Sequence, residues 1–246
     1  MNTNNQTTID PDQVQKFSKL ANEWWDPKGK FKPLHKFNPI RLTYIRDQLC
    51  KQFDLDPQSL KALDGLKILD VGCGGGLISE PLCQMGATVT GIDASSQNIE
   101  IAAHHARTGN LKIDYISTTP EELISARKTF DVVLALEVIE HVKDINLFID
   151  SCSALTSKDG VTILATLNRT AKSFVLAIVG AEYVMRWLPQ GTHDWKKFVR
   201  PSEIFHALRR NNIEAKDISG FNYNILTDTW SLGQNTSVNY VILGAK

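Results

Sequence analysis

The sequence predicts an α/β fold in which a mostly parallel sheet carries helices on both faces. Apolar strand-like segments alternate with helical or mixed segments, an alternation typical of parallel sheets. These segments are residues 66–71, 87–92, 112–116, 131–136 and 161–167. Two more, Ile213–Ser219 and Ser237–Gly244, flank an irregular stretch that suits an antiparallel hairpin. We therefore expect a seven-stranded sheet whose last strand is antiparallel.

The first strand-like segment ends in a glycine-rich turn, Asp70–Gly76, and a helical segment follows from about Leu77 to Met85. Gly72, Gly74 and Gly76 allow positive φ and keep Cβ atoms out of a ligand's path, and the helix start offers free N–H groups. The dinucleotide fingerprint GxGxxG would need glycine at Leu77, but here the spacing is GxGxG. The turn therefore favours S-adenosylmethionine over a pyrophosphate cofactor.

Two aspartates accompany this turn. Asp93 ends the second strand about 20 residues after the first glycine, where a carboxylate can accept hydrogen bonds from both ribose hydroxyls. Alone, such an acid is as often a helix N-cap, but its pairing with the glycine turn favours ribose binding. Asp70 has two equal interpretations: a carboxylate that caps the turn, or a partner for the cofactor's amino group.

The fourth strand delivers Glu137, Glu140 and His141 to its carboxyl end. If this segment turns helically, the three side chains share one face and could hold a divalent cation. Oxygen ligands with one histidine favour Mg²⁺, Mn²⁺ or Zn²⁺. Alternatively, the glutamates are helix-start acids and His141 caps or packs. The strand-end position indicates an active-site role in either case.

Composition is that of one compact enzyme domain. The chain has 246 residues, of which 42% are hydrophobic, and its 27 basic side chains balance 27 acidic ones, so no global field points to nucleic acid. The four cysteines lack CxxC pairing, which argues against zinc sites and disulfides. Met1–Gln13 is polar and has no arginine, so we expect no targeting peptide and a cytoplasmic protein.

Two segments extend the predicted domain, which we place at residues 61–246. Residues 1–60 form an N-terminal helical extension, expected to be a lid over the cofactor and substrate, and residues 169–200 form an insertion after the fifth strand. Within the insertion, residues 173–188 are mostly apolar but too short and interrupted for a membrane span. They suit either an interfacial helix, with Arg169 and Lys172 facing lipid phosphates and Tyr183 and Trp187 at the headgroups, or a helix packed over the active site.

The chain closely resembles the ubiquinone-biosynthesis O-methyltransferases over nearly its whole length. The motifs that carry the resemblance are Trp24-Trp25-Asp26, residues 31–35 and 38–42, Leu69–Gly76, Gly86–Asp93, Glu140-His141-Val142, residues 166–169, 179–183 and 191–194, and Val238-Asn239-Tyr240. The resemblance implies a Rossmann-like class I methyltransferase that methylates ring hydroxyls of polyprenylated phenols and catechols.

The resemblance also implies roles for single residues. Cofactor contacts fall on Arg41, at the methionine carboxylate, on Gly72, on Asp93 and on Leu136, where methionine is the familiar residue. Glu137, Glu140 and His141 match metal-binding positions of relatives, with Mg²⁺ our first expectation. The family insertion is associated with lipid, which favours an anionic lipid surface as a partner and peripheral association with the inner membrane. Other ubiquinone-biosynthesis enzymes are further expected partners.

The expected reaction is in-line methyl transfer to a ring oxygen. A phenol titrates near 10, so a metal at Glu137, Glu140 and His141 would lower the acceptor's pKa, or His141 would act as general base without one. We expect loss of Glu140 or His141 to abolish transfer. Two alternatives stay open: a soluble catechol methyltransferase, and a non-catalytic cofactor-binding subunit of a membrane complex. A NAD dehydrogenase is disfavoured by the missing glycine at Leu77.

Overall fold

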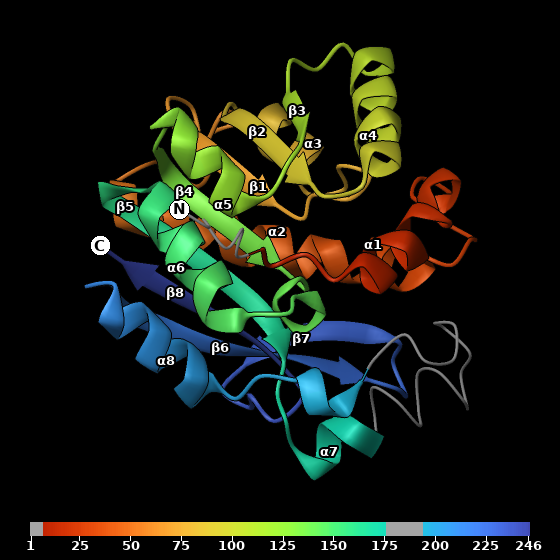
Figure 1. Cartoon of the computed structure of the whole chain (residues 1–246), viewed down its shortest axis with the longest axis vertical. Helices are drawn as coiled ribbons and strands as arrows, with labels where there is room; N and C mark the ends of the chain where they lie inside the picture. Colours follow the sequence, from red (N-terminus) through yellow and green to blue (C-terminus); the bar gives the residue numbers. More distant parts are fainter. Residues whose placement is uncertain (1–6, 176–193) are drawn as a thin grey trace, which may run out of the picture.

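The computed structural model describes residues 7–175 and 194–246, in which one eight-stranded sheet has the order β3-β2-β1-β4-β5-β8-β6-β7 (Figure 1). Strands β1 to β5 are parallel, and β8 pairs antiparallel with both β5 and β6. The strands are β1 Lys67–Val71, β2 Thr88–Asp93, β3 Asp114–Ser117, β4 Phe130–Leu136, β5 Thr156–Leu167, β6 Glu214–Asn224, β7 Thr229–Gly233 and β8 Asn239–Ala245. The predicted α/β fold and the antiparallel last strand are confirmed.

Strand β7 is the element that the sequence did not predict. It pairs with β6 through residues 220–224 and lies in the stretch that we expected to be irregular. None of its five residues is buried, since it forms the edge of the sheet. Trp230 packs partly buried against Phe37, but the rest of this short edge strand carries too little apolar pattern to mark it in the sequence.

Helices cover both faces of the sheet. Ile68 and Val89 point into one apolar cluster with α2, whereas Leu69 and Ile92 point into the other with α6 and α8. Because both faces are covered, the central strands are continuous apolar runs. The helices are α1 Pro11–Ser18, α2 Lys32–Phe53, α3 Ser79–Gln84, α4 Ser96–Thr108, α5 Pro120–Leu123, α6 Ile145–Leu155, α7 Ala171–Ser173 and α8 Pro201–Arg210.

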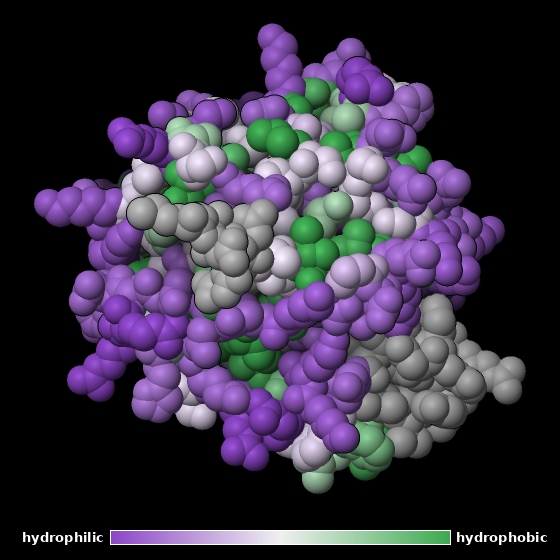
Figure 2. Space-filling model, in the orientation of Figure 1, coloured by the Kyte–Doolittle hydropathy of each residue, from purple (hydrophilic) through white to green (hydrophobic). Residues whose placement is uncertain are grey.

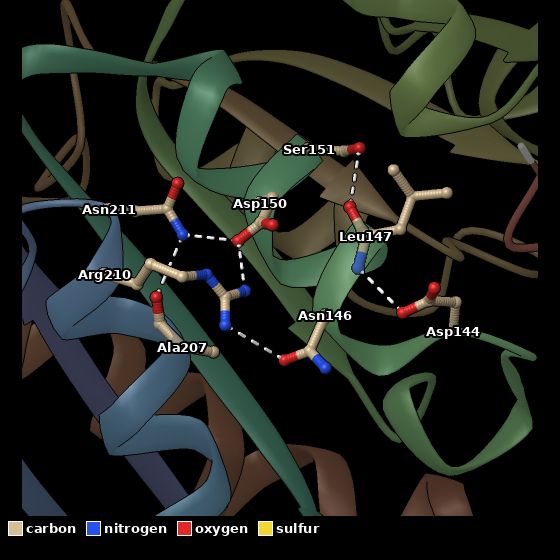
Figure 3. Close-up of polar contacts among 8 residues, drawn as sticks. All are labelled: Asp144, Asn146, Leu147, Asp150, Ser151, Ala207, Arg210 and Asn211. Carbon is tan, nitrogen blue, oxygen red and sulfur yellow. Dashed lines mark hydrogen bonds and ion pairs between the residues drawn. The ribbon is translucent and has the colours of Figure 1, made fainter.

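Helices α6 and α8 are joined by polar contacts on their outer sides (Figure 3). Asp150 Oδ1 accepts hydrogen bonds from Arg210 Nη2 and from Asn211 Nδ2, each at 2.6 Å. Asp144 caps the start of α6 by accepting from Leu147 N at 3.0 Å. These exposed contacts orient the helix pair, while its apolar face supplies most of the stability.

The N-terminal segment, residues 7–31, crosses from α5 to the glycine turn. Near its start, Thr8 N donates to Glu121 Oε1 at 2.7 Å. Lys197 Nζ donates to Asp10 Oδ2 at 2.7 Å, and Ser18 Oγ lies 2.6 Å from Ser95 Oγ at the start of α4. The segment is therefore attached at three places to the domain that carries the sheet.

The surface drawn in Figure 2 is mostly hydrophilic, with hydrophobic residues exposed in patches between polar ones. Within residues 7–175 and 194–246, every helix is too short or too polar to cross a bilayer.

Candidate active site

A pocket of about 800 Å³, measured with its open mouth, lies at the carboxyl ends of β1, β2 and β4. This is the edge at which open α/β sheets bind their ligands. One wall comes from the sheet and includes Gly72, Gly74, Asp93, Glu137 and His141. The N-terminal segment supplies further lining residues, which include Thr8, Asp10, Gln13, Phe17 and Trp24. The predicted residues Arg41, Asp70, Gly76, Leu136 and Glu140 do not line it.

The glycine turn has the backbone conformation that its sequence predicts. Gly72, Gly74 and Gly76 have φ of +71°, +54° and +87°. A Cβ on Gly72 would lie 2.4 Å from Val138 Cγ2, and one on Gly76 would lie 2.3 Å from the Tyr115 hydroxyl oxygen. Glycine is thus required for conformation and for space. Gly72 and Gly74 face the pocket, whereas Gly76 packs against Tyr115.

Two tryptophans of the N-terminal segment cover this turn. A Cβ on Gly74 would lie 2.5 Å from the Trp24 ring, and Trp25 Nε1 donates to Gly75 O at 2.9 Å. Trp24 Nε1 donates to Asn98 Oδ1 at 3.0 Å, and its ring stacks on Phe31 at 3.8 Å. Trp24 and Trp25 belong to a motif that carries the family resemblance, but the sequence predicted no role in the pocket for either of them. The signal available in the sequence was the pair of adjacent glycines, which leaves room for an indole.

Asp93 connects the end of β2 to the turn. Its Oδ2 accepts from Gly74 N at 3.1 Å, and its Oδ1 accepts from Ser95 N at 2.8 Å and Asn98 Nδ2 at 3.2 Å. The N-cap of α4 is Ser95, so the N-cap alternative does not describe Asp93. Burial raises the pKa of this carboxyl, and the three hydrogen bonds oppose the shift.

Asp70 lies beneath the turn. Its Oδ2 accepts from Ser79 Oγ, in the first residue of α3, at 2.6 Å, and its side chain is buried. Burial raises its pKa to about 6. This contact matches the interpretation of Asp70 as a carboxylate that fixes the turn.

The chain turns sharply after β4. Glu137 has φ of +57°, a left-handed conformation that costs a residue with a Cβ about 1 kcal/mol, and its N–H donates to Ala165 O at 2.9 Å. A single 3₁₀ turn follows over Ile139–His141. The expected helical face therefore does not form, because Glu137 lies outside the helical turn. Leu136 packs against the apolar cluster that includes Ile163.

Glu140 points away from the pocket toward β5. Thr166 Oγ1 donates to its Oε2 at 2.7 Å, and its buried Oε1 has no hydrogen-bond partner among the described residues. Burial, and then the charge of Glu137, raise its pKa to about 8. Arg41, also buried, is the nearby cation: burial lowers its pKa, whereas the charges of Glu137, Asp70 and Glu140 raise it.

His141 points the other way, toward the N-terminal segment. Its Nδ1 lies 3.0 Å from Gln13 Oε1, and Phe17 meets its ring edge-on at 5.0 Å. Across residues 7–175 and 194–246, no three His, Cys, Asp or Glu side chains are grouped to hold a metal. The geometry gives the predicted Mg²⁺ site at Glu137, Glu140 and His141 no support, since His141 and Glu140 diverge.

The insertion is described only at its two ends. Arg169 Nε donates to Phe198 O at 2.7 Å, and Nη2 donates to Glu203 at 2.6 and 2.5 Å. The expectation that Arg169 faces lipid phosphates is therefore wrong, because its guanidinium binds the start of α8. Tyr183 and Trp187 lie outside the described residues.

Comparison with known proteins agrees with this geometry. Residues 69–164 match the family described as "Methyltransferase domain". Among solved structures, the magnesium protoporphyrin IX methyltransferase of Synechocystis PCC 6803 with bound SAM has a TM-score of 0.65 and 15% identity, covering 98% of this chain and 100% of that chain. A methyltransferase from Thermotoga maritima has a TM-score of 0.59 and 18% identity, covering 95% and 99%. These likenesses confirm the class I methyltransferase fold.

Curated relatives are much more similar in sequence. The chain is 53% identical over 234 residues to the ubiquinone biosynthesis O-methyltransferase of Pelagibacter ubique, covering 95% of this chain and 97% of that protein. It is 51% identical over 240 residues to the enzyme of the same name from Mesorhizobium japonicum, covering 98% and 96%. By this similarity over nearly the full length of both proteins, the chain belongs to the family of ubiquinone biosynthesis O-methyltransferases.

Proposed function

We propose that this chain transfers the methyl group of S-adenosylmethionine to ring hydroxyls of polyprenylated phenol or catechol intermediates of ubiquinone biosynthesis. The names of its relatives support the reaction and the pathway. The observation that carries the proposal is that Gly72 and Gly74 of the glycine turn, Asp93 and His141 all line the same pocket. A cofactor bound at the turn would present its methyl group toward the residues that follow β4.

The cofactor wall is proposed as follows. Asp93 accepts from the ribose hydroxyls, while Gly72 and Gly74, which line the pocket, offer the cofactor their backbone. Arg41 stays our prediction for the methionine carboxylate, and it lies close enough to the carboxyl groups of Glu137 and Asp70 to influence them electrostatically. The other predicted contacts, Asp70, Gly76 and Leu136, support the turn and the end of β4 from outside the pocket.

His141 is the proposed proton acceptor. The hydroxyl oxygen on the acceptor's ring attacks the methyl carbon, and the sulfonium sulfur leaves with the electron pair of the broken C–S bond. The proton of that hydroxyl passes to His141. Glu140 is not suited to accept that proton directly, because its carboxyl is buried and does not line the pocket. We propose that Glu140 instead keeps the turn after β4 in place through Thr166.

Membrane association is a further part of the proposal. We propose that residues 169–188 bring the chain to an anionic lipid surface, on the cytoplasmic side of the inner membrane. Among the described residues of this segment, the neighbouring apolar side chains Phe174 and Val175 are 44% and 54% exposed, so both could contact a lipid surface. Association with other enzymes of the pathway stays a prediction.

The test is a methyl-transfer assay with the purified chain and radiolabelled S-adenosylmethionine. A reduced demethylated quinone with a prenyl tail should be methylated, and a tail-less catechol should react far more slowly. Equal rates would favour a soluble catechol methyltransferase, and no product with either acceptor would favour a non-catalytic subunit. A parallel reaction with chelator tests the metal: an unchanged rate supports proton acceptance by His141 alone, and lost activity restores the metal prediction.

A further inference from the structure

The N-terminal segment contributes one side chain that touches the proposed proton acceptor through a hydrogen bond. Gln13 lies on α1, and its Oε1 is 3.0 Å from His141 Nδ1, although the two residues are 128 positions apart in the chain. Both residues line the pocket. An amide oxygen can only accept a hydrogen bond, so this contact requires Nδ1 to carry a proton.

The helix holds Gln13 in place on both sides. Phe17 is four residues later on the same face of α1, and it meets the His141 ring edge-on at 5.0 Å and 78°. Asp10 caps the start of α1 and binds Lys197, while Ser18 at its end contacts Ser95. Helix α1 therefore presents one acceptor and one aromatic edge to the imidazole, and the helix itself is attached at each end.

We propose that Gln13 is a positioning residue that selects the tautomer of His141. With the proton on Nδ1, the lone pair of the neutral ring lies on Nε2, which becomes the atom that accepts the proton of the methyl acceptor. The inference rests on the proposed function of His141. It also makes the N-terminal segment part of the proton-transfer site, because the base has its correct tautomer only when α1 is docked.

The direct test is the tautomer itself. Long-range ¹H–¹⁵N spectra of the six histidines, with His141 identified by its absence in His141→Ala, distinguish protonated from unprotonated ring nitrogens. We expect an Nδ1–H tautomer in the unsubstituted chain and in Gln13→Glu, whose carboxylate also accepts. Gln13→Leu should shift His141 toward Nε2–H, the usual form in water. An Nε2–H tautomer in the unsubstituted chain would overturn the proposal.

Kinetics supply the second test. Gln13→Leu should lower kcat about tenfold to a hundredfold, as loss of a histidine's orienting partner commonly does, and Gln13→Glu should restore most of it. Gln15→Ala, on the exposed side of α1, is the matched control and should keep full activity. In the His141→Ala background, Gln13→Leu should cause no further loss.

The outcomes separate the two claims. If His141→Ala is inactive but Gln13→Leu retains full kcat, or if Gln13→Leu slows the His141→Ala chain further, then Gln13 does not act through His141 and this inference fails while the proposed function stands. If His141→Ala turns over normally, the proposed role of His141 fails, whatever the tautomer is. Thermal unfolding and S-adenosylhomocysteine binding are measured for each variant. They test whether a loss of kcat comes from misfolding or from an empty cofactor site.

Discussion

The carboxylates that follow β2 and β4 sit at the same edge of the sheet, but the structure surrounds them differently. Asp93 accepts three hydrogen bonds, two of them from backbone N–H groups. Glu140 accepts one bond, from Thr166, and its other oxygen is buried without a partner among the described residues. Burial raises the pKa of both carboxyls, but at Asp93 the hydrogen bonds oppose the shift, whereas at Glu140 the charge of Glu137 adds to it.

We expect the difference to separate cofactor binding, at the end of β2, from proton transfer, at the residues after β4. The β2 side comprises Asp93 and the glycine turn beside it. Hydrogen bonds there already fix the carboxylate that we propose for the ribose. The β4 side combines a buried carboxyl of raised pKa, Glu140, with the strained backbone of Glu137, and such conditions cluster at reactive sites. Four substitutions test whether this division is real.

The largest effect is expected at the β4 side. His141→Ala should lower kcat at least a hundredfold, because it removes the proposed proton acceptor, and should change the affinity for S-adenosylhomocysteine less than about twofold. Steady-state kinetics and calorimetry measure the two quantities. His104→Ala, an exposed histidine on α4, is the control. A large loss of cofactor affinity in His141→Ala would show that His141 also contributes to cofactor binding and would contradict the division between the two sides.

The next effect belongs to the β2 side. Asp93→Ala should weaken S-adenosylhomocysteine binding by about a hundredfold, because the ribose hydroxyls lose a charged acceptor and Gly74 N and Asn98 Nδ2 lose theirs. Calorimetry tests this against Asp114→Ala, at the exposed start of β3. Unaltered affinity in Asp93→Ala would remove Asp93 from the ribose site.

A smaller effect is expected from the fit between Trp24 and the turn. Gly74→Ala should weaken cofactor binding about tenfold and lower Tm, because the new Cβ would collide with the indole at 2.5 Å. Gly65→Ala is the matched control, since Gly65 also has positive φ, +84°, but open space around it. If Gly74→Ala and Gly65→Ala lower Tm equally and bind the cofactor equally well, then backbone strain, and not the fit against Trp24, explains the requirement for glycine.

The smallest effect is a pH dependence of stability. The folded pKa of Glu140, about 8, lies above its ordinary value of 4.5, so its contribution to stability is present at low pH and is lost as pH rises through 8. Glu140→Gln keeps an acceptor for Thr166 but cannot ionise. Its advantage in unfolding free energy over the unsubstituted chain should grow by on the order of 2 kcal/mol between about pH 6 and pH 8.

Urea unfolding at the two pH values measures this difference, and Glu100→Gln on the exposed side of α4 is the control. Parallel pH profiles for Glu140→Gln and the unsubstituted chain would show that Glu140 is ionised in the folded protein. Glu140 would then be an ionised carboxylate, as we expect for Asp93.

The sequence predicted the β2 side better than the β4 side, for a physical reason. Glycine spacing and a strand-end aspartate describe local backbone geometry, so Gly72, Gly74 and Asp93 lie where the motif places them. The turn at Glu137 was not predictable from propensity, because glutamate rarely adopts positive φ and tertiary contacts hold it there.

Contacts between distant segments were the second limit. Gln13 reaches His141 and Trp24 covers Gly74 only because the N-terminal segment folds back over the sheet edge. Periodicity describes each helix by itself and carries no information on which helix will meet which strand end. The same limit applies to Arg169. From the sequence we expected its guanidinium to face lipid phosphates, but in the fold it binds Glu203.

The left-handed backbone at Glu137 has a consequence for how this chain can be improved or damaged. Glycine at that position would adopt φ of +57° without penalty and should give a more stable fold. Glu137 lines the pocket, so its carboxylate would then be missing from the pocket wall. Position 137 is therefore a point at which a stabilising substitution would also change the lining of the pocket.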